Sequence, residues 1–236
     1  MFNGHISPGR IESRPIQELG AKDVPYRRAH WFSGIAGWEL ALKLARWPSN
    51  IHTWTGSCPC QPFSVAGKQK GIHDDRHLWP VWFNLIRVCK PSVVFGEQVS
   101  SKSAYSWLER VFIDLESASY AVAGADLPAA SVGAPHQRQR LYWVAYATGK
   151  GLPRPVQVER IHRSEGSAFT RSGHDFTVAR RALAGDFNDL LPVDGISKDM
   201  GRGRLKAYGN SIVPQVAAAF ISSVMQALNI EPEPEL

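Results

Sequence analysis

Strand-like and helix-like segments alternate along the chain from residue 29 to residue 146, and this order constrains the fold more than any other feature. Short apolar runs typical of buried strands occupy residues 29–32, 52–56, 92–96, 120–128 and 140–146. Amphipathic spacing predicts helices over residues 38–47, 76–89, 103–120 and 213–229. Because alternating strands and helices favour a mostly parallel sheet covered on both faces, the sequence predicts an α/β fold.

Three loops with unusual residues directly follow strand-like runs. Their sequences are SGIAG at 33–37, SCPCQPFS at 57–64 and GEQVS at 96–100. In parallel sheets the carboxyl ends of the strands lie along one edge, and binding sites form in the loops beyond it. We therefore expect these three loops to line one crevice.

Composition excludes several classes of protein. A chain of 236 residues suffices for one sizeable α/β domain. The three cysteines, Cys58, Cys60 and Cys89, cannot all pair internally, which argues against a disulfide-built secreted domain and favours a reducing compartment. The first residues lack an apolar signal core, and the longest uncharged stretch contains Gly, Asn and Pro, so no membrane span is expected. A formal charge of +6 favours a polyanionic partner only weakly.

The segment 57–64 contains the most reactive group. Cys58 and Cys60 lack a second ligand pair at metal-binding spacing, so a structural zinc site is not expected. Pro59 and Pro62 stiffen the loop on both sides of Cys60, as a nucleophile held in one attack geometry requires. The alternative interpretation of the same residues is a buried cysteine without a chemical role.

Five segments together resemble the motifs of DNA (cytosine-5) methyltransferases, in the order in which that family carries them. SCPCQPFS resembles the catalytic Pro-Cys-Gln segment, and WFSGIAGWELAL (31–42) resembles the opening cofactor motif. GEQV (96–99) resembles Glu-Asn-Val, APHQRQRLYWVA (134–145) resembles Gln-x-Arg-x-Arg, and AYGNSIVPQVAAAF (207–220) resembles the closing Gly-Asn motif. Five ordered matches are far more specific than one. The chain is similar to short members borne by phages and prophages.

The resemblance implies a reaction and its catalytic residues. Cys60 would add as a thiolate to carbon 6 of cytosine and so activate carbon 5 for methylation. Glu97 would protonate or hydrogen-bond ring nitrogen 3. Arg138 and Arg140 would share one face of a strand and point into the crevice, because alternate strand residues do so. His136 stands where the family has Gln, and we assign it no role.

The resemblance also implies S-adenosyl-L-methionine as the methyl donor and no metal. Gly34 and Gly37 would let the backbone turn tightly and approach the cofactor, just before a helix N-terminus. Phe32 would pack on the ligand, and Asn210 and Ser211 would close the site. The implied partner is double-stranded DNA with a flipped cytosine, since carbon 6 is not accessible within the base stack. Residues 64–71 resemble the family's mobile loop over DNA.

One region departs from the family pattern. Two strand–helix units that normally follow the first motif, with acids for the cofactor's ribose and adenine, have no room in the 23 residues from Gly37 to Cys60. No acidic residue lies between Glu39 and Cys60. Ala36 and Gln98 replace the family's Gly and Asn. The candidates for the missing acids are Glu12, Glu18 and Asp23.

We expect a Rossmann-like S-adenosylmethionine-dependent methyltransferase core with a shortened sheet, formed by residues 29–146 plus 205–230. Residues 1–28 would be an irregular lead-in, and residues 147–204 a small irregular target-recognition region. Residues 150–206 contain 11 Lys or Arg and 7 Asp or Glu, so +4 of the chain's +6 lies there.

The predicted function is therefore a cytoplasmic DNA cytosine-5 methyltransferase of a bacterium or phage-infected cell. We expect a monomer, and the resemblance allows a cognate restriction endonuclease as a further partner. The alternative is a degenerate relative that binds DNA or a partner without turnover. The joint presence of the catalytic Cys, Glu and Arg residues and of Asn210 favours the active enzyme. A redox or metal protein built on the two neighbouring cysteines is the least favoured interpretation.

Overall fold

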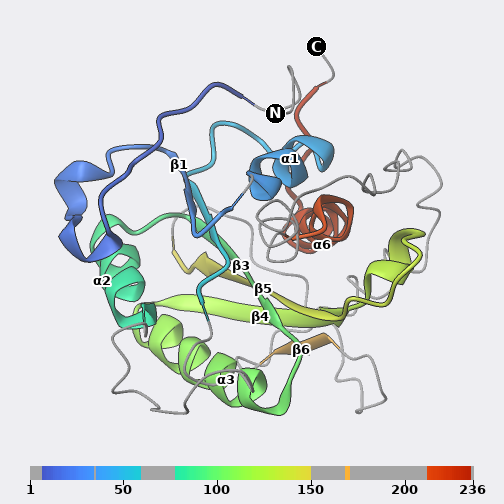
Figure 1. Ribbon diagram of the computed structural model, residues 1–236. Helices are drawn as coiled ribbons and strands as arrows, with labels where there is room; N and C mark the ends of the chain where they lie inside the picture. The colour runs from blue at the N-terminus through green and yellow to red at the C-terminus, as the bar shows by residue number, and fades with distance from the viewer. Residues whose placement is uncertain (1–6, 35, 60–77, 150–167, 171–211, 235–236) are drawn as a thin grey trace.

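The computed structural model describes residues 7–34, 36–59, 78–149, 168–170 and 212–234, the short segment 168–170 by its backbone alone. These residues form three layers, with a sheet between two pairs of helices (Figure 1). Helices α1 (Gly37–Leu44) and α6 (Pro214–Ala227) cover one face. Helices α2 (Trp79–Cys89) and α3 (Lys102–Ser117) cover the other.

The sheet of the described residues has six strands in the order β1-β2-β3-β5-β4-β6. Their bounds are β1 (Arg28–Trp31), β2 (Thr53–Gly56), β3 (Val93–Val99), β4 (Tyr120–Leu127), β5 (Arg140–Ala147) and β6 (Ala168–Thr170). β1, β2 and β3 pair in parallel, and β5 pairs antiparallel with β3, β4 with β5, and β6 with β4. Four of the six strands, β1 to β4, thus share one direction, which confirms the predicted α/β class with a mostly parallel sheet.

The reversed strand β5 matters most for the site. A strand that runs against its neighbours begins at the edge where they end. In the register of the pair, Arg140 lies opposite Val99, and Tyr142 lies opposite Glu97. The beginning of the arginine segment is therefore brought to the carboxyl end of β3, where the predicted acid lies.

β1 pairs directly with β2 and lies at the edge of the described sheet. β2 leads straight into the segment that contains the cysteines. This arrangement follows from the short interval between the first motif and Cys60, which leaves no residues for further strands between these two elements.

Residues 7–27, expected to be irregular, contain two single-turn 3-10 helices, η1 (Ile16–Glu18) and η2 (Ala21–Asp23). Ile16 and Val24 are buried in the same apolar cluster as α2 and α3, so this segment contributes to the core. A third short helix, η4 (Ala129–Val132), precedes β5. In the region expected to be irregular beyond residue 147, β6 adds a short strand to the sheet.

The predicted end of the first helix was wrong. Helix α1 ends at Leu44 rather than at Trp47, because Arg46 adopts a left-handed backbone with φ 53° and the N–H of Trp47 closes the helix by bonding the Leu42 carbonyl at 2.9 Å. The indole of Trp47 then donates to Thr53 Oγ1 at 2.8 Å. Of the helices that the structure describes, none is both long and apolar enough to cross a membrane.

Candidate functional site

Glu97 lies near the carboxyl end of β3 and is the centre of the site. Its side chain is buried, with 7% of the residue exposed, on the face of the sheet covered by α1 and α6. The Nε of Arg140 approaches Glu97 Oε1 at 3.0 Å. The predicted acid and one predicted arginine are therefore in direct contact.

Burial raises the pKa of the Glu97 carboxyl, because a charge is poorly solvated there. The charges of Arg140 and Arg138 and a hydrogen bond from Ser57 act in the opposite direction, and burial outweighs them. An acid with a raised pKa keeps its proton nearer to neutral pH, which suits a group that donates a proton to a base.

The sequence predicted that Arg138 and Arg140 share one strand, and this prediction was wrong. β5 begins at Arg140, and Arg138 precedes it with φ 34°, outside the extended region, so strand alternation does not orient its side chain. Its charge still acts on Glu97, and burial together with the charge of Arg140 lowers the pKa of Arg138. Both predicted arginines therefore influence the Glu97 carboxyl, Arg140 from the start of β5 and Arg138 from the loop before it.

Gln98, the neighbour of Glu97, points to the opposite face of the sheet and holds the cysteine loop. Its Nε2 donates to the Cys58 carbonyl at 3.0 Å, and its Oε1 accepts from the Val99 N–H at 2.8 Å. Gln therefore makes structural hydrogen bonds in the position where the family has Asn. Cys58 is buried in the apolar cluster. This burial agrees with the interpretation of Cys58 as a cysteine without a chemical role.

Ser57 and Trp38 belong to the site and were not predicted. The Trp38 indole Nε1 donates to Ser57 Oγ at 3.2 Å, and the Ser57 hydroxyl hydrogen-bonds the Glu97 carboxyl. The signal in the sequence was the position of Ser57, directly between β2 and the cysteine motif.

Tyr142 lies beside Glu97 in the adjacent strand and is fully buried. Burial raises its pKa, and its hydroxyl bonds the backbone of Val213 at the start of α6. Its ring meets Trp38 edge-on at 6.4 Å and Phe220 at 5.9 Å between centroids. The ring thus joins β5 to both helices on this face, directly behind the acid.

The predicted cofactor loop between β1 and α1 has an unusual backbone. Phe32, Gly34 and Ala36 have φ of 52°, 55° and 65°, in the left-handed region. Gly tolerates this conformation, and Ala36 adopts it at a cost that the family's Gly would avoid. The Phe32 ring meets Trp82 edge-on at 5.9 Å.

Gly34 and Gly37 have different roles. A Cβ built on Gly34 would meet none of the described residues within 4 Å, so these residues leave space open beside this turn. A Cβ on Gly37 would lie 2.9 Å from Cγ1 of Ile212, so Gly37 allows close packing on the residue that directly follows Asn210 and Ser211. Open space at Gly34, the Phe32 ring and a helix start without a side-chain cap fit the chemistry of a cofactor held through backbone groups.

The acidic residues nearest in sequence to this loop already have partners. Glu39, buried in the first turn of α1, bonds His30 Nε2 at 2.9 Å and Arg28 NH1 at 3.4 Å. Burial opposes ionisation, yet hydrogen bonds from His30 and Ser7 and the charge of Arg28 hold the pKa of Glu39 below its ordinary value.

Two of the candidate acids in the lead-in are paired with one arginine. Arg14 NH2 lies 2.9 Å from Glu12 Oε2 and 3.1 Å from Asp23 Oδ1. These contacts give no support to a role for either acid at the cofactor. Three predicted residues, Cys60, Asn210 and Ser211, lie outside the described residues, as does the predicted DNA loop at 64–71.

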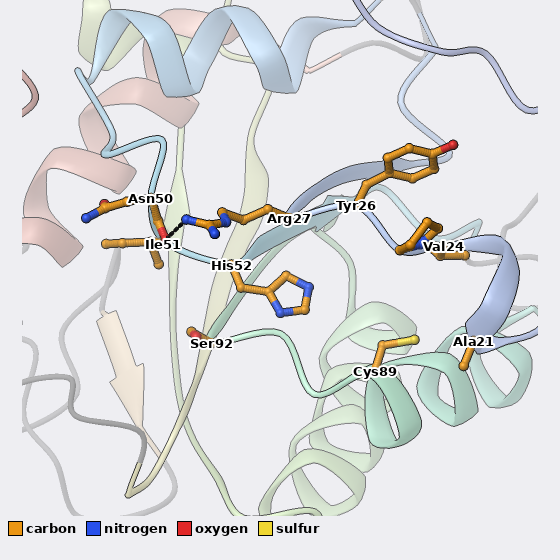
Figure 2. A pocket seen from close by; sticks show the side chains of 10 residues that line it. Ala21, Val24, Tyr26, Arg27, Asn50, Ile51, His52, Cys89 and Ser92 are labelled. Atoms are coloured by element: carbon orange, nitrogen blue, oxygen red, sulfur yellow. Dashed lines mark hydrogen bonds between the residues drawn. The ribbon is translucent and has the colours of Figure 1, made fainter.

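A hollow of about 680 Å³ lies at the opposite edge of the sheet (Figure 2). Arg27, His52 and Ser92, which directly precede β1, β2 and β3, line it together with Cys89 at the end of α2. The Arg27 guanidinium donates to the Asn50 carbonyl at 2.9 Å. None of the predicted site residues that the structure describes lines this hollow. It is therefore separate from the cluster around Glu97.

The family model of the C-5 cytosine-specific DNA methylases matches residues 43–172, more than half of the chain. The chain belongs to this family. The match includes the cysteine segment, Glu97 and both arginines, so the methylase motifs and the geometry around Glu97 concern the same residues.

Curated relatives of the chain are Type II methyltransferases. The chain is 36% identical over 117 residues to M.AplI of Arthrospira platensis, which covers 49% of this chain and 33% of the relative. It is 34% identical over 111 residues to M.HhaI of Haemophilus parahaemolyticus, which covers 42% of this chain and 33% of the relative. The chain thus spans about a third of the length of these relatives.

Solved structures similar to the chain include a Dnmt2 methyltransferase of S. pombe, with 23% identity and a TM-score of 0.41. That match covers 52% of each chain. A Spodoptera frugiperda DNMT2 mutant matches with 19% identity and a TM-score of 0.44, over 58% of this chain and 55% of the other.

Proposed function

We propose that this chain is a DNA (cytosine-5) methyltransferase that transfers a methyl group from S-adenosyl-L-methionine to carbon 5 of cytosine in double-stranded DNA. The observation that carries the proposal is the buried Glu97 carboxyl, held by Arg140 at 3.0 Å beside the loop that leads to Cys60. A carboxyl in that environment is suited to act on a ring nitrogen while a neighbouring thiolate attacks the ring.

The reaction begins with the thiolate of Cys60. Its sulfur forms a bond to carbon 6 of the flipped cytosine, and the electron pair of the carbon 5–carbon 6 double bond moves into the ring. Glu97 donates its proton to nitrogen 3, which neutralises the charge that develops there. Carbon 5 is then an enamine carbon and a nucleophile.

S-adenosyl-L-methionine, when bound, would supply an electrophilic methyl group on its sulfonium, and the sulfur would keep the electron pair of the broken sulfur–methyl bond as a neutral thioether. After carbon 5 has taken that group, its remaining proton passes to water and the double bond between carbons 5 and 6 forms again. Cys60 leaves as the thiolate with the electron pair of its bond to carbon 6, and Glu97 recovers its proton from nitrogen 3. Every proton and electron pair is then accounted for, and the residues return to their starting states.

Each remaining predicted residue has a place in this scheme. Arg140 fixes the Glu97 carboxyl, and Arg138 adds positive charge beside it. The cofactor would be held by Phe32, Gly34, Gly37, Asn210 and Ser211.

We further propose that residues 29–146 and 205–230 form the catalytic core, with residues 1–28 as the lead-in. Residues 147–204 would then recognise the target sequence. About sixty residues give room for few side-chain contacts to bases, each worth roughly 1–3 kcal/mol of discrimination. We therefore expect a short or loosely specified recognition site.

The experiment is nucleoside mass spectrometry of DNA from cells that express the chain, with Cys60→Ser as the matched variant. We expect 5-methylcytosine with the wild type only, while Cys60→Ser retains DNA affinity within a few-fold. The absence of any modified base in both samples would instead favour a degenerate relative that binds DNA without turnover. A methyl group on the exocyclic nitrogen would contradict the role given to Cys60.

A further inference from the structure

Ser57 connects three elements of the site. It follows β2 directly and precedes the cysteine motif by sequence. Its backbone N–H donates to the Trp31 carbonyl at the end of β1, at 3.3 Å. Its hydroxyl accepts from the Trp38 indole of α1 at 3.2 Å and hydrogen-bonds Glu97 of β3.

The hydrogen bonds at the Ser57 hydroxyl have a defined direction. An indole N–H only donates, so the hydroxyl oxygen must accept from Trp38. The hydroxyl proton is then left to donate to the Glu97 carboxyl. Trp38 is fully buried in the helix that follows the cofactor loop, so its ring cannot easily turn away. The orientation of the Ser57 hydroxyl is therefore fixed from the cofactor side of the site.

The Glu97 carboxyl is held from two directions. Arg140 binds Oε1 from β5, and Ser57 approaches from the loop after β2. Among the described residues, Arg138 and Tyr142 also act electrostatically at this carboxyl. A carboxyl bound by one arginine alone could still rotate about its terminal side-chain bond. The Ser57 hydroxyl, as a second donor from another element, removes that freedom.

We propose that Ser57 is a positioning residue which, through its hydrogen bond from Trp38, holds the Glu97 carboxyl in the orientation needed to act on the target base. The effect of Ser57 on catalysis rests on the proposed function. The hydrogen bonds from Trp38 to Ser57 and from Ser57 to Glu97 rest on geometry alone. These bonds couple the helix that follows the cofactor loop to the acid that meets the base.

The first test measures the link without relying on turnover. Carbon-13 NMR of labelled glutamate side chains follows the titration of Glu97, whose signal is identified by its loss in Glu97→Gln. Because the Ser57 hydroxyl stabilises the carboxylate, Ser57→Ala should make Glu97 titrate at higher pH. Trp38→Phe should move the titration in the same direction by less, and Ser57→Thr should restore it.

The matched control is Ser117→Ala, which removes an exposed serine hydroxyl at the end of α3 that donates to the local Asp114 carbonyl at 2.6 Å. This variant should leave the Glu97 titration unchanged. An unchanged titration in Ser57→Ala, with the fold intact by circular dichroism, would overturn the inference.

The second test measures methyl transfer. Ser57→Ala should lower kcat by about tenfold, the effect of one hydrogen bond to a charged group, with KM for DNA and cofactor nearly unchanged. Ser57→Thr should recover most of kcat. If the wild type transfers no methyl group but the titration moves as expected, the proposed function fails and the positioning role stands. If the wild type is active and Ser57→Ala keeps its full kcat, the positioning role fails.

Discussion

The Glu97 side chain shows how one residue can be held between opposing effects. Burial favours its protonated form, while Arg140, Arg138 and Ser57 favour the carboxylate. Burial is the largest of these effects, so its pKa lies above the ordinary value of 4.5. The carboxyl therefore keeps its proton to higher pH than an ordinary glutamate, and this shift also affects the stability of the fold.

The stability prediction concerns Glu97→Gln. Between pH 4.5 and the raised pKa, the folded protein binds more protons at Glu97 than the unfolded chain does. The contribution of Glu97 to the free energy of unfolding is therefore present at low pH and falls as pH rises through that window. Gln does not titrate, so the stability of the wild type minus that of Glu97→Gln should decrease with rising pH.

Urea denaturation of both proteins at a series of pH values measures this difference. Titrations of all other groups cancel in the subtraction, provided that they are independent of residue 97. A difference that increases with pH would contradict the raised pKa and would show that the arginines dominate over burial.

The sequence predicted the site residues that lie in recognisable motifs. It missed those whose role depends on contacts that only the fold creates. Glu97 and Arg140 were found because their segments resemble family motifs, and the structure brings them together at 3.0 Å. Ser57 was missed because serine is common in loops, and only the fold brings a Trp38 indole and a β3 carboxyl to its hydroxyl. The strand argument failed for Arg138 because β5 begins two residues later.

At the scale of elements, two glycines allow tryptophans to pack directly on the sheet. A Cβ on Gly56, the last residue of β2, would lie 2.6 Å from Cη2 of Trp82 and 3.1 Å from the Trp31 carbonyl. A Cβ on Gly96 in β3 would meet the Trp143 ring. The strands β2 and β3, which lead into the loops with the predicted catalytic residues, are therefore fixed by aromatic rings packed on them.

Gly56→Ala should destabilise the protein by about 2 kcal/mol, because the added methyl group overpacks a site bounded by a buried ring and a backbone carbonyl. The measurement is the midpoint of thermal or urea unfolding. Gly9→Ala, where a Cβ meets no described residue within 4 Å, is the control and should change stability little. Equal stability of Gly56→Ala and the wild type would mean that Trp82 moves aside easily.

Element order could be predicted from hydrophobic period alone, and the described strands and long helices follow it. Strand direction could not, because an apolar run has the same pattern in either direction, so the reversal of β5 is visible only in the structure. The end of α1 is set by the left-handed backbone of Arg46, which the apolar spacing of residues 38–47 does not reveal. β6 has only three residues, too few for a periodic signal.

At the scale of the whole molecule, charge is unevenly distributed along the chain. The chain has a formal charge of +6, and residues 150–206 supply +4 of it. If this region recognises DNA, binding releases counterions, and the logarithm of the affinity should fall linearly with the logarithm of the salt concentration.

Fluorescence anisotropy with a labelled duplex, using Cys60→Ser without cofactor, measures this slope. Each phosphate contact contributes about −0.9 to it, so replacing Arg180 and Arg181 by Ala should make it shallower. Arg14→Ala, which removes a charge already paired with Glu12 and Asp23, should not. An affinity independent of salt would contradict DNA as the ligand.

The tryptophans packed on β2 and β3 give the protein an internal optical probe. Trp79 lies 5.7 Å from Trp82, 5.9 Å from Trp107 and 6.1 Å from Trp143 between ring centroids. Rings this close exchange excitation energy, so their emission reports on the group as a whole. Phe32 of the predicted cofactor loop packs edge-on against Trp82. A ligand bound at that loop should therefore alter the ultraviolet emission of the tryptophans, and ligand titrations could be followed without any attached dye.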